Sequence, residues 1–148
     1  MDLGLNGKVA IVTGGSDGIG KAAATSLASE GAKVAIVGRT QSESGGEVIG
    51  VSADVSVESS VQAMVAKVVS EFGGIDILVN NAGTSSSTTL EKMTDADLET
   101  DFGIKIYGAI YCARAALPHL KASGTGAIIN TTTPGGKAAR PGSQPTDL

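Results

Sequence analysis

Thr13-Gly-Gly-Ser-Asp-Gly-Ile-Gly20 is a glycine-rich stretch between two regular elements. The apolar run before it predicts a β-strand over 8–13, and the pattern after it predicts a helix over 21–30. Glycines let the backbone turn tightly and approach a ligand closely. The amino end of a helix offers N–H groups and a positive dipole that suit an anion. The stretch therefore indicates either a phosphate site or a glycine-rich turn without a ligand.

The neighbouring residues extend this stretch into a βαβ unit. Ile19, Ala23 and Leu27 recur at a spacing of four, which gives the helix one apolar stripe, and Gly31 stands where a helix ends. The apolar run over 33–37 predicts a second strand that is covered on both faces. Strand, helix and strand in about 30 residues predict a right-handed parallel crossover.

The segment 39–47 is polar, and only these residues separate the second strand from the apolar run 48–51, which predicts a third strand. A parallel crossover usually needs at least about 10–12 residues, generally with a helix. Either a bare loop makes this connection, or a helical segment is absent from the chain. We favour an absent segment.

Helices and strands continue to alternate along the rest of the chain. Ser56 is expected to cap a helix over 57–72, and Thr94 a long helix over 95–122 that Pro118 should kink or end. Apolar runs at 75–79 and 127–131 predict strands four and five. The expected apolar stripes are Val61, Met64, Val65, Val68, Val69 and Phe72 in the first helix, and Leu98, Phe102, Ile106, Ile110, Ala113 and Leu117 in the second.

Composition limits the class of protein. A chain of 148 residues with 41% hydrophobic residues can form one globular core. A net charge of -4 without a basic run argues against nucleic acid or an anionic membrane as a partner. Cys112 is the single cysteine, and no metal-ligand cluster is evident. Without a signal peptide or a membrane-spanning stretch, we expect a cytoplasmic protein.

Small and polar residues stand at the carboxyl ends of the predicted strands. In an open parallel sheet, ligands bind beyond those ends. The residues therefore predict a ligand-binding rim, made of segments 13–20, 38–39, 54–55, 80–83 and 131–136.

These segments resemble the short-chain dehydrogenase/reductase family. The resemblance rests on the motif 13–20, on Asp54-Val55 and on Asn80-Asn81-Ala82-Gly83, with support from Gly108, 115–118 and 128–130. It implies an α/β fold, a Rossmann-type doubly wound parallel sheet of about five strands in the order 3-2-1-4-5. It further implies an NAD(P)-binding Rossmann domain over 1–133, lacking the family's last strands, and a Gly/Pro/Thr-rich tail over 134–148.

The resemblance also assigns cofactor contacts. The glycine loop would face the pyrophosphate, Asp54 and Val55 the adenine, and 81–83 the adenosine ribose. Asp54 as a turn residue, and Asn80 and Asn81 as ties between strands, are the structural alternatives. The implied cofactor-binding residues are Gly14, Ser16, Gly18, Ile19, Gly20, Arg39, Asp54, Val55, Asn80, Asn81, Ala82 and Gly83.

Residues after the second strand bear on the choice of cofactor. An NAD site places an Asp or Glu there to bind the ribose 2′-OH, whereas this chain has Gly38-Arg39. Arg39 could grip a 2′-phosphate, which favours NADP(H) over NAD(H). Asp17 argues against this preference, because NADP-linked relatives often carry a base at that position.

The catalytic residues of the family are largely replaced. Where the family has Asn, Ser and Tyr, this chain has Lys105, Thr133 and Thr146, and a Lys four residues after Thr146 would lie beyond the chain. Thr133 keeps a hydroxyl, whereas a threonine cannot replace a phenol. The resemblance implies hydride transfer between NADP(H) and a carbonyl or alcohol substrate. The alternative is a catalytically silent NADP-binding fragment or pseudoenzyme. An uncovered apolar face on the helix 95–122 would favour a homo-oligomer.

Overall fold

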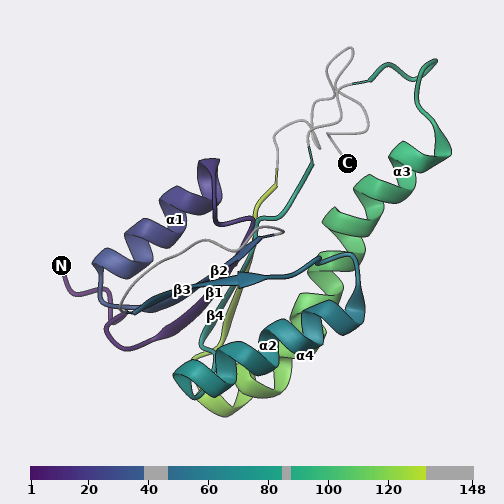
Figure 1. Cartoon of the computed structure of the whole chain (residues 1–148). Helices are drawn as coiled ribbons and strands as arrows, with labels where there is room; N and C mark the ends of the chain where they lie inside the picture. Colours follow the sequence, from purple (N-terminus) through teal and green to yellow (C-terminus); the bar gives the residue numbers. More distant parts are fainter. Residues whose placement is uncertain (39–46, 85–87, 133–148) are drawn as a thin grey trace.

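A computed structural model of the chain describes residues 1–38, 47–84 and 88–132. Its five strands form one parallel sheet in the order β3-β2-β1-β4-β5 (Figure 1). The predicted fold class and strand order are therefore confirmed. The strands are β1 (Val9–Thr13), β2 (Lys33–Gly38), β3 (Val48–Ser52), β4 (Ile77–Asn80) and β5 (Ala127–Asn130).

Helices cover both faces of this sheet. Helix α1 (Gly18–Ser29) lies on one face, and α2 (Glu58–Phe72) and α4 (Gly108–Ser123) lie side by side on the other (Figure 1). Successive residues of a strand point to opposite faces. In β1, Val9 and Ile11 accordingly join the core beneath α2 and α4, whereas Ala10 and Val12 join the core beneath α1.

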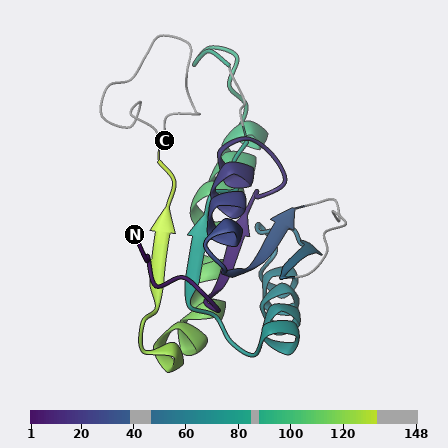
Figure 2. The same ribbon diagram turned by 90° about the vertical axis from the view of Figure 1, so that its left-hand side faces the viewer.

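The central strand β1 is buried throughout and pairs with β2 on one side and β4 on the other. The chain therefore builds the sheet outward from β1 in one direction through β3, and then returns to add β4 and β5 in the other direction. Such a reversal opens a crevice at the carboxyl ends of the strands, between β1 and β4. Figure 2 shows that β5 forms the far edge of the sheet.

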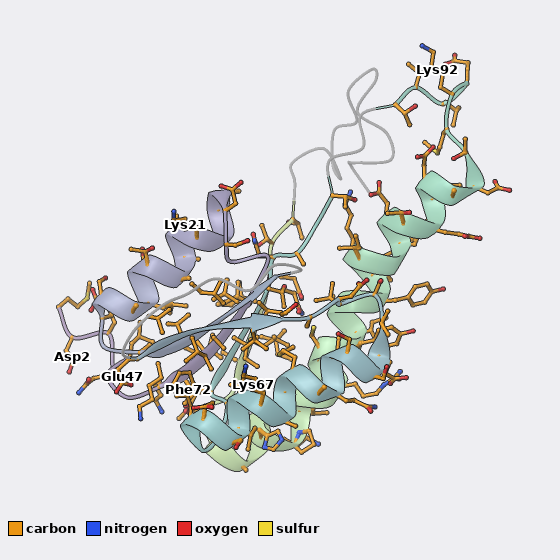
Figure 3. All side chains as sticks on the ribbon, in the orientation of Figure 1. Asp2, Lys21, Glu47, Lys67, Phe72 and Lys92 are labelled. Carbon is orange, nitrogen blue, oxygen red and sulfur yellow. The ribbon has the colours of Figure 1, made fainter. Side chains whose placement is uncertain are left out.

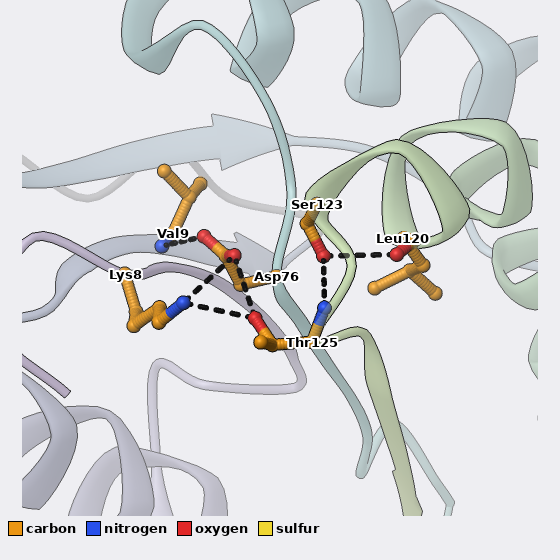
Figure 4. A network of polar contacts seen from close by, with 6 residues as sticks. All are labelled: Lys8, Val9, Asp76, Leu120, Ser123 and Thr125. Atoms are coloured by element: carbon orange, nitrogen blue, oxygen red, sulfur yellow. Dashed lines mark hydrogen bonds and ion pairs between the residues drawn. The ribbon is translucent and has the colours of Figure 1, made fainter. Parts of the chain in front are cut away.

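The amino ends of the strands are joined by a polar network (Figure 4). Asp76 accepts a hydrogen bond from the backbone N–H of Val9 at 2.9 Å and pairs with Lys8 at 3.5 Å. The Lys8 ammonium also donates to Thr125 Oγ1 at 2.9 Å, just before β5. The network therefore ties β1, β4 and β5 together at the end opposite the crevice, which leaves the carboxyl ends for function.

Two predicted helix starts are wrong. Helix α1 begins at Gly18 rather than at residue 21, because the Asp17 carboxylate accepts a hydrogen bond from Gly18 N and caps the helix. Helix α2 is preceded by Val57 rather than capped by Ser56. The Ser56 hydroxyl and backbone N–H both donate to Asp54 Oδ1, at 2.6 and 2.9 Å, so Ser56 belongs to the turn before the helix.

The predicted helix 95–122 is interrupted by a π-helical turn. Helix α3 (Asp95–Phe102) starts with the expected Thr94 cap, the turn η1 (Gly103–Tyr107) follows, and α4 then runs through Pro118. Figure 2, like Figure 1, shows α3 reaching past the carboxyl ends of the strands. A π turn adds a residue to the helical repeat, and such turns often accompany functional sites.

The apolar stripe predicted for α4 does not face the sheet. Ile110 and Leu117 are 46% and 42% exposed, whereas the buried face consists of Gly108, Cys112, Ala116 and Leu120. Small residues allow a closer approach: a Cβ at Gly108 would lie 2.9 Å from Val55 Cγ2. Apolar spacing alone could not identify which of the two apolar faces packs on the sheet.

Four sequence predictions concern residues outside the described ranges. The connection between β2 and β3 falls mostly there, although the parallel pairing of these strands is confirmed. Arg39 and Thr133 also lie outside, and the tail boundary at 133/134 stays a prediction. Within the described ranges, no helix is long and apolar enough to cross a membrane.

Candidate functional site

The glycine loop after β1 forms one wall of the crevice. Gly14 and Gly18 have φ angles of +62° and +51°, a region that L side chains rarely adopt. The Gly14 N–H donates to Val37 O at 2.7 Å, which fixes the loop to the end of β2. Because α1 begins at Gly18, the first-turn residues Gly18, Ile19 and Gly20 lie at the mouth of the loop.

Close packing makes two of these positions intolerant of a side chain. A Cβ at Gly20 would overlap the carbonyl oxygen of Gly14 and the amide nitrogen of Asn81. A Cβ at Gly14 would lie 3.0 Å from Ala82 Cα. At Gly18, by contrast, no atom lies within 4 Å of the Cβ position. The loop is therefore pressed against the residues after β4 while its outer edge stays open.

Thr13 organises the residues after β4, a role the sequence did not identify. Its buried Oγ1 accepts hydrogen bonds from the backbone N–H groups of Asn81 and Ala82, each at 3.0 Å, and donates to Val79 O at 3.3 Å. Asn81 Nδ2 donates to Gly14 O at 3.1 Å. The end of β4 and the glycine loop are thus locked to each other. A hydroxyl at the last position of a buried strand was the available signal.

Asn80 lies deeper, between β4, β5 and α4. Its Nδ2 donates to Asn130 Oδ1 at 2.9 Å and approaches Ala109 O at 3.5 Å. Its Oδ1 is buried and has no hydrogen-bond partner among the described residues. A buried acceptor without a partner is costly, which fits a site completed by a ligand or water.

Two joined cavities follow the carboxyl ends of the strands. The smaller, of about 340 Å³, runs from the glycine loop past β2 and β3. The larger, of about 680 Å³, lies between β4, β5 and the π turn. Both are lined by Val55, Ala82, Gly83, Thr84 and Ile104, so they form one continuous crevice.

Most of the sequence-predicted site residues line this crevice. The smaller cavity is lined by Gly14, Ser16 and Asp54, the larger one by Ile19 and Asn80, and both by Val55. Both cavities are lined by Ala82 and Gly83, and Asn81 lines the larger one. Gly18 and Gly20 shape the loop but are not among the described residues that line either cavity.

The two chambers of the crevice differ in the charge of the side chains that line them. Asp17 and Asp54 line the smaller cavity. Lys105 is the one charged side chain among the described residues that line the larger cavity. Asp54 is also part of a turn, since its Oδ1 accepts from Ser56 N at 2.9 Å, so the structural alternative for this residue holds in part.

Lys105 belongs to a polar cluster at the π turn. Its ammonium lies 3.6 Å from Asp101 Oδ2, and Thr84 Oγ1 donates to Asp101 Oδ1. The Asp101 side chain is 3% exposed and that of Lys105 is 19% exposed. The carboxylate is therefore buried beside Lys105, which lines the cavity, whereas Asp101 is not among the described lining residues. Helical periodicity could not predict this placement, because the π turn changes which residues share a face.

The crevice fits an elongated anion with apolar parts. The tight glycine loop and the first turn of α1 can hold a phosphate group. Ile19, a large apolar side chain that is 71% exposed, stands beside the larger cavity. The buried Asn80 Oδ1 can accept a hydrogen bond from a ligand amide. No group of three His, Cys, Asp or Glu side chains that could hold a metal occurs in the described part of the chain.

The fold and this crevice define a dinucleotide-binding class of protein, and comparison with known proteins identifies the family. The family model for short chain dehydrogenase matches residues 8–145. The chain belongs to the short-chain dehydrogenase/reductase family.

Two relatives by sequence illustrate the match. The short-chain reductase protein NovJ of Streptomyces niveus is 39% identical over 132 residues, which cover 82% of this chain and 50% of NovJ. General stress protein 39 of Bacillus subtilis is 37% identical over 141 residues, covering 87% of this chain and 49% of that protein. The chain thus spans about half the length of these relatives.

Solved structures agree with the fold. The 3-ketoacyl-(acyl-carrier-protein) reductase of Brucella melitensis, crystallised with NADH, matches with a TM-score of 0.88 and 34% identity, over 94% of this chain and 62% of that one. The NADH-dependent reductase A1-R′, complexed with NAD, matches with a TM-score of 0.87 and 30% identity, over 97% and 67%. These relatives bind nicotinamide dinucleotides.

Proposed function

We propose that this chain binds a nicotinamide dinucleotide along the crevice, with the pyrophosphate at the glycine loop. The contact between Gly20, Gly14 and Asn81 carries this proposal, because it packs the glycine loop tightly against the residues after β4 and so holds the loop and the first turn of α1 at the crevice, where backbone N–H groups can bind a phosphate. The adenosine half lies in the smaller cavity beside Asp54 and Val55, and the nicotinamide half in the larger cavity beside Asn80.

We propose further that the protein is an oxidoreductase acting on a carbonyl or alcohol. When bound, the cofactor supplies or accepts a hydride at the substrate carbon, while a proton goes to or leaves the substrate oxygen. Thr13 and Asn81 hold the cavity walls in place, and the apolar side chains of Ile19, Ile104 and Ile110 line the larger cavity. Thr133, at the family's Ser position, is the proposed group that orients the substrate oxygen.

The alternative is a silent dinucleotide-binding chain, since Lys105 and Thr146 replace the family's Asn and Tyr. NADPH consumption, followed by its absorbance with a panel of aldehydes and ketones, separates the two functions. Consumption that depends on a carbonyl, and is lost in Thr133→Val, supports the oxidoreductase. Binding of NADPH without consumption for every carbonyl tested supports the silent chain.

NADP(H) is the proposed form of the cofactor. Arg39 follows β2, where a 2′-phosphate would lie, and no carboxylate occupies positions 38 and 39. Asp17 and Asp54 oppose the preference because they add negative charge to the smaller cavity. Competition between NADPH and NADH for the same chain measures which of the two cofactors binds more tightly. Tighter binding of NADH would contradict the preference.

Self-association through α4 is also proposed. An apolar stripe is exposed by Ile110 and Leu117 on this helix and by Ile106 in the preceding π turn, and the edge strand β5 exposes Ile128 and Ile129. Sedimentation velocity of the wild type and of an Ile110→Gln, Leu117→Gln variant tests this: the variant should be monomeric at concentrations where the wild type is not.

We also propose a cytoplasmic location, because a single cysteine cannot form an internal disulfide.

A further inference from the structure

The larger cavity carries an unusual electrostatic feature. Lys105 is the one charged side chain among the described residues that line it, and its partner Asp101 is buried beside it. The pair is therefore a dipole with its positive member, Lys105, in the cavity wall and its negative member, Asp101, outside the described lining. Because the Lys105 side chain is only 19% exposed, water screens this charge less than it would at the surface.

The position of this dipole relative to a bound dinucleotide follows from the fold. The adenosine half of such a ligand lies toward β2, where the residue after the strand meets the ribose. The other half therefore crosses the switch point between β1 and β4 and enters the larger cavity. That half contains the nicotinamide ring, which carries a positive charge when oxidised and none when reduced.

We propose that Lys105 makes this site bind the reduced cofactor more tightly than the oxidised one. This inference rests on the proposed function. The ammonium repels the charged pyridinium and has no such effect on the neutral dihydropyridine. Asp101 weakens the repulsion, but its buried side chain is not among the described residues that line the cavity. The oxidised cofactor is a product of carbonyl reduction, so its weaker binding favours reduction over oxidation. In that direction the hydride moves from the cofactor to the substrate carbon.

The test measures a ratio of affinities rather than activity. The dissociation constants of NADPH and NADP⁺ are determined by calorimetry for the full chain and for Lys105→Met, which removes the charge at similar length. The NADP⁺/NADPH ratio of dissociation constants should fall roughly fivefold in the variant, as expected for a partly compensated charge near the ring. Lys105→Arg keeps the charge and should keep the ratio. Lys92→Met removes an exposed lysine in the segment before α3 (Figure 3) and should leave the ratio unchanged.

These measurements separate failure of this inference from failure of the proposed function. A ratio in Lys105→Met equal to that of the wild type overturns the inference while leaving the proposed function intact. Failure of the wild type to bind either form overturns the proposed function, and the inference with it. If Lys105→Met does not fold, Lys105→Gln gives the same comparison with a polar side chain.

Discussion

Asn81 Nδ2 donates a hydrogen bond to the carbonyl oxygen of Gly14 at 3.1 Å, which joins the end of β4 to the glycine loop after β1. These segments lie far apart in the sequence but meet at the switch point of the sheet. Gly20 fills the space beneath this bond, and its missing side chain makes the bond attainable. The site therefore depends on the contact between the residues that follow β1 and those that follow β4, and the glycine loop supplies only one side of this contact.

Gly20→Ala should break this arrangement. Its Cβ would overlap both Gly14 and Asn81, so we expect a loss of about 1–3 kcal/mol in the free energy of unfolding, as for overpacking. NADPH affinity should fall with it. Gly74→Ala is the matched control, because nothing lies within 4 Å of its Cβ position. Urea unfolding measures both variants, and an equal effect would show that the contact is not tight.

Asp17→Asn should raise the affinity for NADPH several-fold relative to NADH. The change removes a negative charge from the smaller cavity, and an asparagine oxygen can still cap α1 at Gly18. The comparison of the two dissociation constants cancels any effect on the loop common to both cofactors. Equal changes for NADPH and NADH would mean that Asp17 does not act on the 2′-phosphate.

Two leucines on α4 test which face of the helix packs on the sheet. Leu120 is 4% exposed and Leu117 is 42% exposed. Leu120→Ala should therefore cost about 2–4 kcal/mol in the free energy of unfolding, whereas Leu117→Ala should cost less than about 1 kcal/mol. The reverse order, measured by urea unfolding of the two variants, would restore the face predicted from the sequence.

Cys112 should make stability fall at high pH. Burial raises the pKa of this thiol from its ordinary value of 9.0 to about 11. The unfolded thiol ionises first, so stability is intact below the ordinary pKa and is lost as pH rises through the pKa of the folded state. Urea unfolding at pH values on either side of this window should show a smaller decrease in Cys112→Ala than in the wild type. Identical decreases would exclude the thiol as a cause.

The strands and their order could be predicted because the signals are local and repeated. Short apolar runs between polar turns locate β1, β2 and β4 within about two residues, and the glycine motif specifies the switch point. The residues Asn80–Gly83 could be placed beside the glycine loop for the same reason. These parts depend on periodicity and on strand ends, which the sequence shows directly.

Other features depend on packing that no short pattern records. The π turn at Gly103–Tyr107 rotates α4 relative to α3, so the buried face consists of Gly108, Cys112, Ala116 and Leu120 instead of the larger apolar residues. The same turn brings Lys105 to the cavity with Asp101 beside it. Ser56 was misassigned because its hydroxyl and its backbone N–H are held by Asp54 in a local turn before the helix.

The contact between the glycine loop and the end of β4 is the basis of the proposed dinucleotide site. Titration of the purified chain with NADPH and with NADH, followed by calorimetry and by melting temperature, tests it most directly. We predict saturable binding with a rise in melting temperature for at least one cofactor, and loss of that rise in Gly20→Ala but not in Gly74→Ala. The absence of heat and of stabilisation with both cofactors would contradict the claim.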